Sequence, residues 1–234
     1  MTRRTITRVT IYLLGLCILA FGLTLSTKAD LGVSPIIAVS FSISKLTGAR
    51  FGDMTFLLYA SFVVIEMVLH LIPGKRAPSD RKKAIIADVL QLPLSYVFTM
   101  FMNVLSEWIP SAETIAARVA VLLISVVLVG TGAALSLDMR LIANPGDGIV
   151  QAISDRAGIS LGLTKNIVDI TCVTITCILT MTVLHHIIGV GAGTVVAMLG
   201  IGRVIALVNK AFGDRLMHLS GTEAYSASES RIRS

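Results

Sequence analysis

The chain is dominated by six apolar stretches of roughly twenty residues each, separated by short polar connections. They cover residues 9–27, 54–72, 85–105, 116–137, 164–184 and 194–213. An α-helix rises about 1.5 Å per residue, so roughly twenty apolar residues can cross a hydrocarbon core of about 30 Å. Because backbone polar groups in lipid must be paired within the chain, the sequence predicts an all-α, polytopic membrane helix bundle with about six transmembrane helices.

The composition supports this fold class and excludes others. Hydrophobic residues make up 54% of the 234 residues and charged residues only 15%, which is far from the values of a soluble domain. Lys and Arg (20) exceed Asp and Glu (14), but the basic residues stand at the ends of the apolar stretches and form no nucleic-acid-binding motif. We therefore expect the lipid bilayer as the main partner, and no nucleic acid.

An internal repeat relates the second half of the chain to the first. Pro145 stands 110 positions after Pro35, and each follows a small polar residue, Asn144 or Ser34. Identical residues keep this spacing elsewhere, namely Arg8/Arg118, Gly22/Gly132, Ser44/Ser154, Gly48/Gly158 and Gly52/Gly162. Proline and glycine in one register indicate duplication more strongly than shared leucines in apolar helices do. The repeat also favours a retained first span over a cleaved signal peptide, because its counterpart lies in mid-chain.

The repeat divides the chain into residues 1–110, residues 111–213 and a tail, 214–234, whose Ser, Arg and Glu content predicts disorder. Each repeat holds three spans. Because three is an odd number, the second repeat starts on the opposite side of the membrane, and the two halves have opposite orientations. The result is an inverted 3+3 repeat, as in many secondary transporters. Both termini and the basic loop from Lys75 to Lys83 then lie on one side, which the positive-inside rule predicts to be cytoplasmic.

Residues 34–47 and 145–157 are too short to cross the bilayer and are expected to form half-helices. A capping residue followed by proline is typical of the first turn of a helix. If the two half-helices enter from opposite sides, their N-terminal N–H groups and positive dipole ends converge inside the bundle. We therefore expect a binding site for a small solute, lined by Ser34, Pro35, Asn144, Pro145 and Asp147. The alternative is that both segments lie flat at the membrane surfaces.

Four ionisable residues lie within or near the ends of the predicted spans: Glu66, Asp88, Asp169 and Arg203. An ionisable side chain at membrane depth is a functional candidate, so these residues are candidates for ion or proton coupling. The alternative is a structural ion pair of Arg203 with Asp88 or Glu66. No catalytic constellation, metal-ligand spacing or cofactor motif is present, so the sequence predicts no enzyme, no metal and no cofactor.

Three motifs resemble the YitT/YczE family of bacterial integral membrane proteins. They are Ala29-Asp30-Leu31-Gly32-x-Ser34-Pro35, Asn144-Pro145-Gly146-Asp147-Gly148 and Gly193-Thr194. The resemblance covers residues 9–212 and implies a multi-pass protein of the bacterial plasma (inner) membrane. The first copy has Ile37 at the place of Asp147, so only the second half carries the acid at this position.

Two functions fit the sequence. The inverted repeat and the paired half-helices favour a small secondary transporter or permease of a small solute. The small size and short loops favour the alternative, a non-transporting membrane factor that assists a biosynthetic or regulatory partner. A homodimer is compatible with both.

Overall fold

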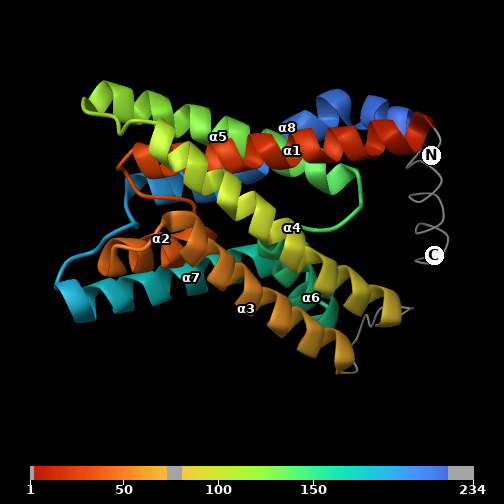
Figure 1. Ribbon diagram of the computed structural model, residues 1–234, viewed down its shortest axis with the longest axis horizontal. Helices are drawn as coiled ribbons and strands as arrows, with labels where there is room; N and C mark the ends of the chain where they lie inside the picture. Colours follow the sequence, from red (N-terminus) through yellow and green to blue (C-terminus); the bar gives the residue numbers. More distant parts are fainter. Residues whose placement is uncertain (1–2, 73–80, 221–234) are drawn as a thin grey trace.

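The computed structural model describes residues 3–72 and 81–220, and these residues form eight helices and no strand (Figure 1). The helices are α1 (Arg3–Lys28), α2 (Pro35–Thr47), α3 (Phe51–Leu71), α4 (Arg81–Trp108), α5 (Ile115–Asp138), α6 (Pro145–Ala157), α7 (Leu161–Leu184) and α8 (Ala192–Ser220). All except α2 and α6 are long and apolar enough to cross a membrane. The predicted all-α bundle of six spans and two short helices is confirmed.

The helices extend further than the apolar stretches suggest. The fourth helix begins at Arg81 and ends at Trp108, and α8 continues to Ser220, beyond the predicted end at residue 213. Helical hydrogen bonds continue past the apolar core into polar sequence, which hydropathy alone does not reveal. Residues 221–234, the rest of the predicted tail, and most of the predicted basic loop lie outside the described residues.

The two short helices have the same length and end in the same way. Each has 13 residues, begins with proline and is followed by a glycine in the left-handed region, Gly48 with φ 74° and Gly158 with φ 69°. The N–H of Gly48 donates to the carbonyl of Ser44 at 2.9 Å, and that of Gly158 donates to Ser154 at 2.8 Å. This conformation suits glycine, because other residues pay a steric cost there. The glycines that recur in the sequence therefore end equivalent helices.

Helices α1 and α5 pack closely along their length, and their contacts are reciprocal. A Cβ on Gly22 would lie 2.7 Å from the backbone nitrogen of Val129, and a Cβ on Gly132 would collide with the backbone nitrogen of Leu19. Gly22 corresponds to Gly132, and Leu19 to Val129, at the spacing of 110 residues. Each repeat therefore gives the other the same glycine contact, which lets the two backbones approach closely.

A second pair of contacts is also exchanged between the halves. Arg8 donates from Nε to the carbonyl of Met139 at 2.7 Å and from Nη2 to that of Arg140 at 2.9 Å. Its counterpart, Arg118, places Nη1 3.1 Å from Oδ2 of Asp30. Asp30 and Arg140 both have positive φ, 52° and 47°. Each arginine thus holds the connection that precedes the short helix of the other half.

The packing of the other helices follows the same exchange only in part. Helix α2 packs against α7, and α6 packs against α3. Helix α3 packs along α4, and α1 contacts α8, whereas the corresponding pairs, α7 with α8 and α5 with α4, make few or no contacts. The start of α1, the start of α4 and the end of α8 lie at the same end of the bundle (Figure 1).

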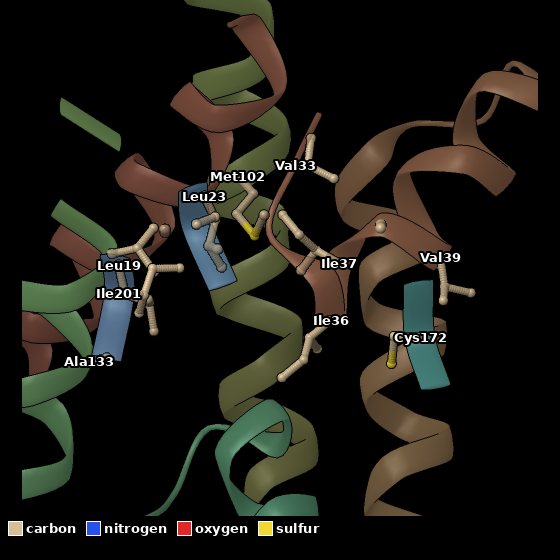
Figure 2. Packing of buried hydrophobic residues seen from close by; sticks show 14 of the residues in the cluster. Leu19, Leu23, Val33, Ile36, Ile37, Val39, Met102, Ala133, Cys172 and Ile201 are labelled. Carbon is tan, nitrogen blue, oxygen red and sulfur yellow. The ribbon is translucent and has the colours of Figure 1, made fainter. Parts of the chain in front are cut away.

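The core gathers around the beginning of α2. Figure 2 shows Leu19, Ala133 and Ile201, from α1, α5 and α8, grouped together, with Leu23 and Met102 between them and Ile36 and Ile37 of α2. One internal cavity is lined by Leu19, Ile36, Ile37, Ala133 and Ile201. The apolar core therefore encloses the place where the two halves meet.

A polar cavity where the two short helices begin

The first turns of α2 and α6 lie close together. A Cβ on Gly146 would lie 3.5 Å from Cγ2 of Ile36. Ser34 from the first half and Asn144 and Asp147 from the second line the same cavity, of about 50 Å³. Two helices lying flat at opposite membrane surfaces would be separated by the thickness of the bilayer, and their first turns could not touch.

The two N-termini are capped differently. Oδ1 of Asn144 accepts a hydrogen bond from the N–H of Gly146 at 3.1 Å, whereas the side chain of Ser34 makes no capping bond. Pro35 and Pro145 are buried and carry no N–H. The N-terminus of α2 therefore keeps its positive dipole end without a side-chain cap, which suits an acceptor group of a solute.

Asp147 brings a carboxylate into this cavity. It is half-buried in the first turn of α6, and its carboxylate makes no hydrogen bond with another described residue. The side-chain cap of α6 comes from Asn144 instead. Capping, the simplest structural role for an acid at this position, therefore does not explain Asp147.

Lys165 of α7 shares the cavity with Asp147, and the sequence interpretation missed it. Its Nζ lies 3.5 Å from Oδ2 of Asp169, whose side chain is 1% exposed. The two residues are four apart on one helix, and this spacing was the available signal. At full ionisation Asp147, Asp169 and Lys165 carry one net negative charge.

A larger cavity, of about 410 Å³, lies between α5, α6 and α7, and Asp147 and Lys165 line this cavity as well. Arg140 and Gln151 line it further out. Arg140 follows the end of α5, and this end of the bundle also holds the start of α1 (Figure 1). Asp147 therefore stands between the inner cavity and a wider one near that end.

Glu66 and Asp88 do not line the inner cavity, and each has a partner on a neighbouring helix. Oε2 of Glu66 accepts a hydrogen bond from Nε2 of Gln91 at 2.8 Å, and the carboxylate rests against Gly148 of α6. Nδ1 of His70 lies 2.8 Å from Oδ2 of Asp88. The side chains of Glu66 and Asp88 are almost fully buried.

The alternative of an ion pair between Arg203 and Asp88 or Glu66 does not occur in the structure. Arg203 is exposed on α8 and forms no ion pair with a described acid, while Asp88 lies against His70 and Glu66 binds Gln91. The reason is helical geometry, because Ile201 faces the inner cavity and a residue two positions later points about 200° away.

These features define a multi-pass helical membrane protein with an internal polar cavity between two short helices. The chain belongs to the family of unknown function DUF6198, which it matches over residues 6–210. It is 28% identical to the uncharacterized membrane protein YczE of Bacillus subtilis over 172 residues, which cover 73% of this chain and 74% of that protein. It is also 26% identical to an uncharacterized protein of Haemophilus influenzae over 199 residues, covering 84% and 81%. No solved structure matches the chain.

Proposed function

We propose that the protein is a small secondary transporter or permease of a small polar solute, which binds where α2 and α6 begin. One observation carries the proposal. Ser34 and Asp147 come from different halves of the chain and line one cavity, and neither side chain is used in a hydrogen bond with another described residue. Polar groups inside a membrane protein are costly unless they are satisfied, so an unused pair favours a ligand role.

The charges around the cavity favour a solute with both donor and acceptor groups. Asp147 suits an ammonium group or another hydrogen-bond donor. Lys165 supplies one positive charge for the two carboxylates of Asp147 and Asp169, so at full ionisation one negative charge is left for the solute to balance. The uncapped N-terminus of α2 on the opposite wall suits an acceptor. A small polar or zwitterionic solute satisfies both walls at once.

The exchanged contacts of the two halves support an inverted repeat. The glycine contacts of α1 with α5 and the arginine contacts with the opposite connections both obey the 110-residue correspondence. In an inverted repeat of this kind, one half can rock against the other around a central site and open it to either side.

We further propose that the protein spans a bacterial plasma membrane with both termini in the cytoplasm. Arg4 and Arg8 near the start of α1, Arg81, Lys82 and Lys83 at the start of α4, and Lys210 and Arg215 near the end of α8 all belong to one end of the bundle. The positive-inside rule favours the cytoplasm for that end.

The proposal is tested with purified protein in proteoliposomes. The vesicles are incubated with a mixture of isotope-labelled amino acids, amines and small carboxylic acids, and their contents are measured by mass spectrometry. We expect uptake of at least one compound by the parent protein, and loss of that uptake in Asp147→Asn. The matched control is Asp155→Asn, because Asp155 lies on the same helix and binds only the exposed Gln151.

Normal uptake by a folded Asp147→Asn variant would contradict the assigned role of Asp147. The absence of uptake of every compound by the parent protein would favour the alternative, a non-transporting membrane factor that assists a biosynthetic or regulatory partner.

A further inference from the structure

Helices α3 and α4 hold a row of buried polar side chains between them. Glu66 and His70 stand four positions apart on α3 and therefore share one face of that helix. Asp88 and Gln91 stand three positions apart on α4 and share a face in the same way. Nε2 of Gln91 donates to Oε2 of Glu66 at 2.8 Å. Nδ1 of His70 lies 2.8 Å from Oδ2 of Asp88. Two side-chain hydrogen bonds, one turn apart, thus join the two helices.

The row runs from one end of the bundle toward its interior. His70 is in the last turn of α3, and Asp88 follows the start of α4, which lies at the same end of the bundle as the start of α1 (Figure 1). The side chain of His70 is 18% exposed, whereas Glu66 is only 1% exposed. His70 is therefore the outer member of the row and Glu66 the inner one.

Glu66 meets little that stabilises a negative charge. An ionised carboxylate can accept about four hydrogen bonds. Glu66 accepts one from Gln91, its Oε1 is buried without a partner, and it forms no ion pair with another described residue. The charged groups that act on it are Asp88 of α4 and Asp147 of α6, and both are acidic. Burying an uncompensated charge is costly, so this environment favours the neutral acid.

The positive residues on the helices that pack against α3 stand at a distance from this carboxyl group. On α4 the closest in sequence, Lys83, precedes Gln91 by eight positions, which is more than two turns. On α6, Arg156 follows Gly148 by the same number of positions. On α2 the charged residue is Lys45, which is exposed beside the start of α3, several turns away. A proton is therefore the positive charge that the carboxyl group can take up.

We propose that Glu66 binds and releases a proton during transport, and that His70 and Asp88 connect it to the end of the bundle where α4 begins. A proton from water at that end joins the carboxylate of Glu66 and gives the neutral acid, and the reverse step returns the proton to water. No other reactant is needed. Rows of acidic residues and histidine carry protons in this way inside pumps and transporters.

Gly148 brings this carboxyl group next to the solute site. A Cβ on Gly148 would lie 2.6 Å from Oε2 of Glu66, so the carboxyl group rests directly on α6 near its start. The preceding residue, Asp147, lines the inner cavity. A proton on Glu66 removes a negative charge beside Asp147 and leaves Asp147 free to hold the charge that a cationic group of the solute binds. Coupling of proton and solute rests on the proposed transport function, whereas an exchangeable proton on Glu66 does not.

The proton is tested by infrared spectroscopy of the purified full-length protein in D₂O without any solute. A protonated carboxyl group gives a C=O stretching band that a carboxylate lacks. We expect the parent protein to show this band and to lose it reversibly as the pH is raised, and Glu66→Gln to lack it. Gln91→Leu removes the hydrogen bond to Oε2 and should shift the band to higher frequency. The matched control is Glu107→Gln, because Glu107 is exposed on α4 and should leave the band unchanged.

A band that persists in Glu66→Gln would overturn the proposal, because it would belong to another acid. A band that does not respond to pH would also overturn it, because it would mark a fixed, structural acid. If Glu66→Gln does not fold, Gln91→Leu decides, and an unshifted band would count against Glu66. Asp88→Asn should slow the response of the band to a jump in pH, and an unchanged rate would overturn the role of His70 and Asp88.

Coupling is tested in proteoliposomes with the labelled compound that the parent protein takes up. An inward proton gradient should concentrate this compound inside vesicles that hold the parent protein or Glu107→Gln. In vesicles with Glu66→Gln the compound should reach only its external concentration. Accumulation driven by the proton gradient in Glu66→Gln would overturn the coupling. A parent protein whose band responds to pH but which takes up no compound would contradict only the transport function.

Discussion

The carboxylate of Glu66 occupies the space in which a side chain on Gly148 would begin. A Cβ on Gly148 would lie 2.6 Å from Oε2 and 2.8 Å from Oε1 of Glu66. The contact joins α3 of the first half to α6 of the second, directly after Asp147 in the chain. The absence of one side chain therefore lets α3 and α6, which belong to different halves of the chain, approach each other at a buried carboxyl group.

This contact predicts that Gly148→Ala destabilises the protein. The added methyl group must displace a carboxylate that is buried and held by Gln91. Overpacking of this kind costs about 1–3 kcal/mol, and it should lower the unfolding temperature of the purified protein in detergent.

Gly162→Ala is the matched control for this prediction. Gly162 lies in the first turn of α7, and a Cβ there would meet nothing within 4 Å. Alanine at such a position stabilises by about 0.4–1 kcal/mol. Equal effects of Gly148→Ala and Gly162→Ala would show that the Glu66 contact is not tight.

The reciprocal glycine contacts predict matched effects in the two halves. Gly22→Ala and Gly132→Ala each place a methyl group against the backbone of the facing helix, which cannot move aside cheaply. Both should destabilise by about 1–3 kcal/mol, measured by thermal unfolding. Gly202→Ala on α8 meets open space and should not destabilise. A large loss in only one of the two variants would contradict an equivalent packing of the halves.

The inverted repeat predicts that Thr47 and Ala157, which correspond at the 110-residue spacing, lie on opposite sides of the membrane. Both are exposed, and they are the last residues of α2 and α6. In a protein whose three native cysteines are replaced, Thr47→Cys should react with a membrane-impermeant thiol reagent only from outside. Ala157→Cys should react only from inside. Labelling of both from one side would contradict the inverted arrangement.

The sequence alone predicted the elements that depend on local rules. Pro35 and Pro145 after capping residues, and Gly48 and Gly158 at the ends, define the short helices within a residue or two. These signals are local because proline fixes the first turn of a helix and glycine tolerates the left-handed turn that ends it.

The direction in which each span faces could not be predicted in the same way. In a membrane protein the lipid-facing side of a helix is as apolar as its packed side, so hydrophobicity does not distinguish them. For this reason the sequence left open an ion pair of Arg203 that the exposed position of Arg203 does not allow. The same ambiguity concealed Lys165, which resembles a solvated charge near the start of a span but lines the cavity beside Asp147.

Labelling of a cysteine at position 34 tests the central claim most directly. It shows whether the cavity opens alternately to the two sides of the membrane, and the identity of the solute need not be known. Ser34 is half-buried and lines the inner cavity, and Asp147 lines both this cavity and the wider one near the end of α5. In the cysteine-replaced protein, reconstituted in one orientation, Ser34→Cys should react with an impermeant thiol reagent from both sides, while Thr47→Cys and Ala157→Cys each react from one. Labelling of Ser34→Cys from a single side, or from neither, would contradict alternating access and the transport function built on it.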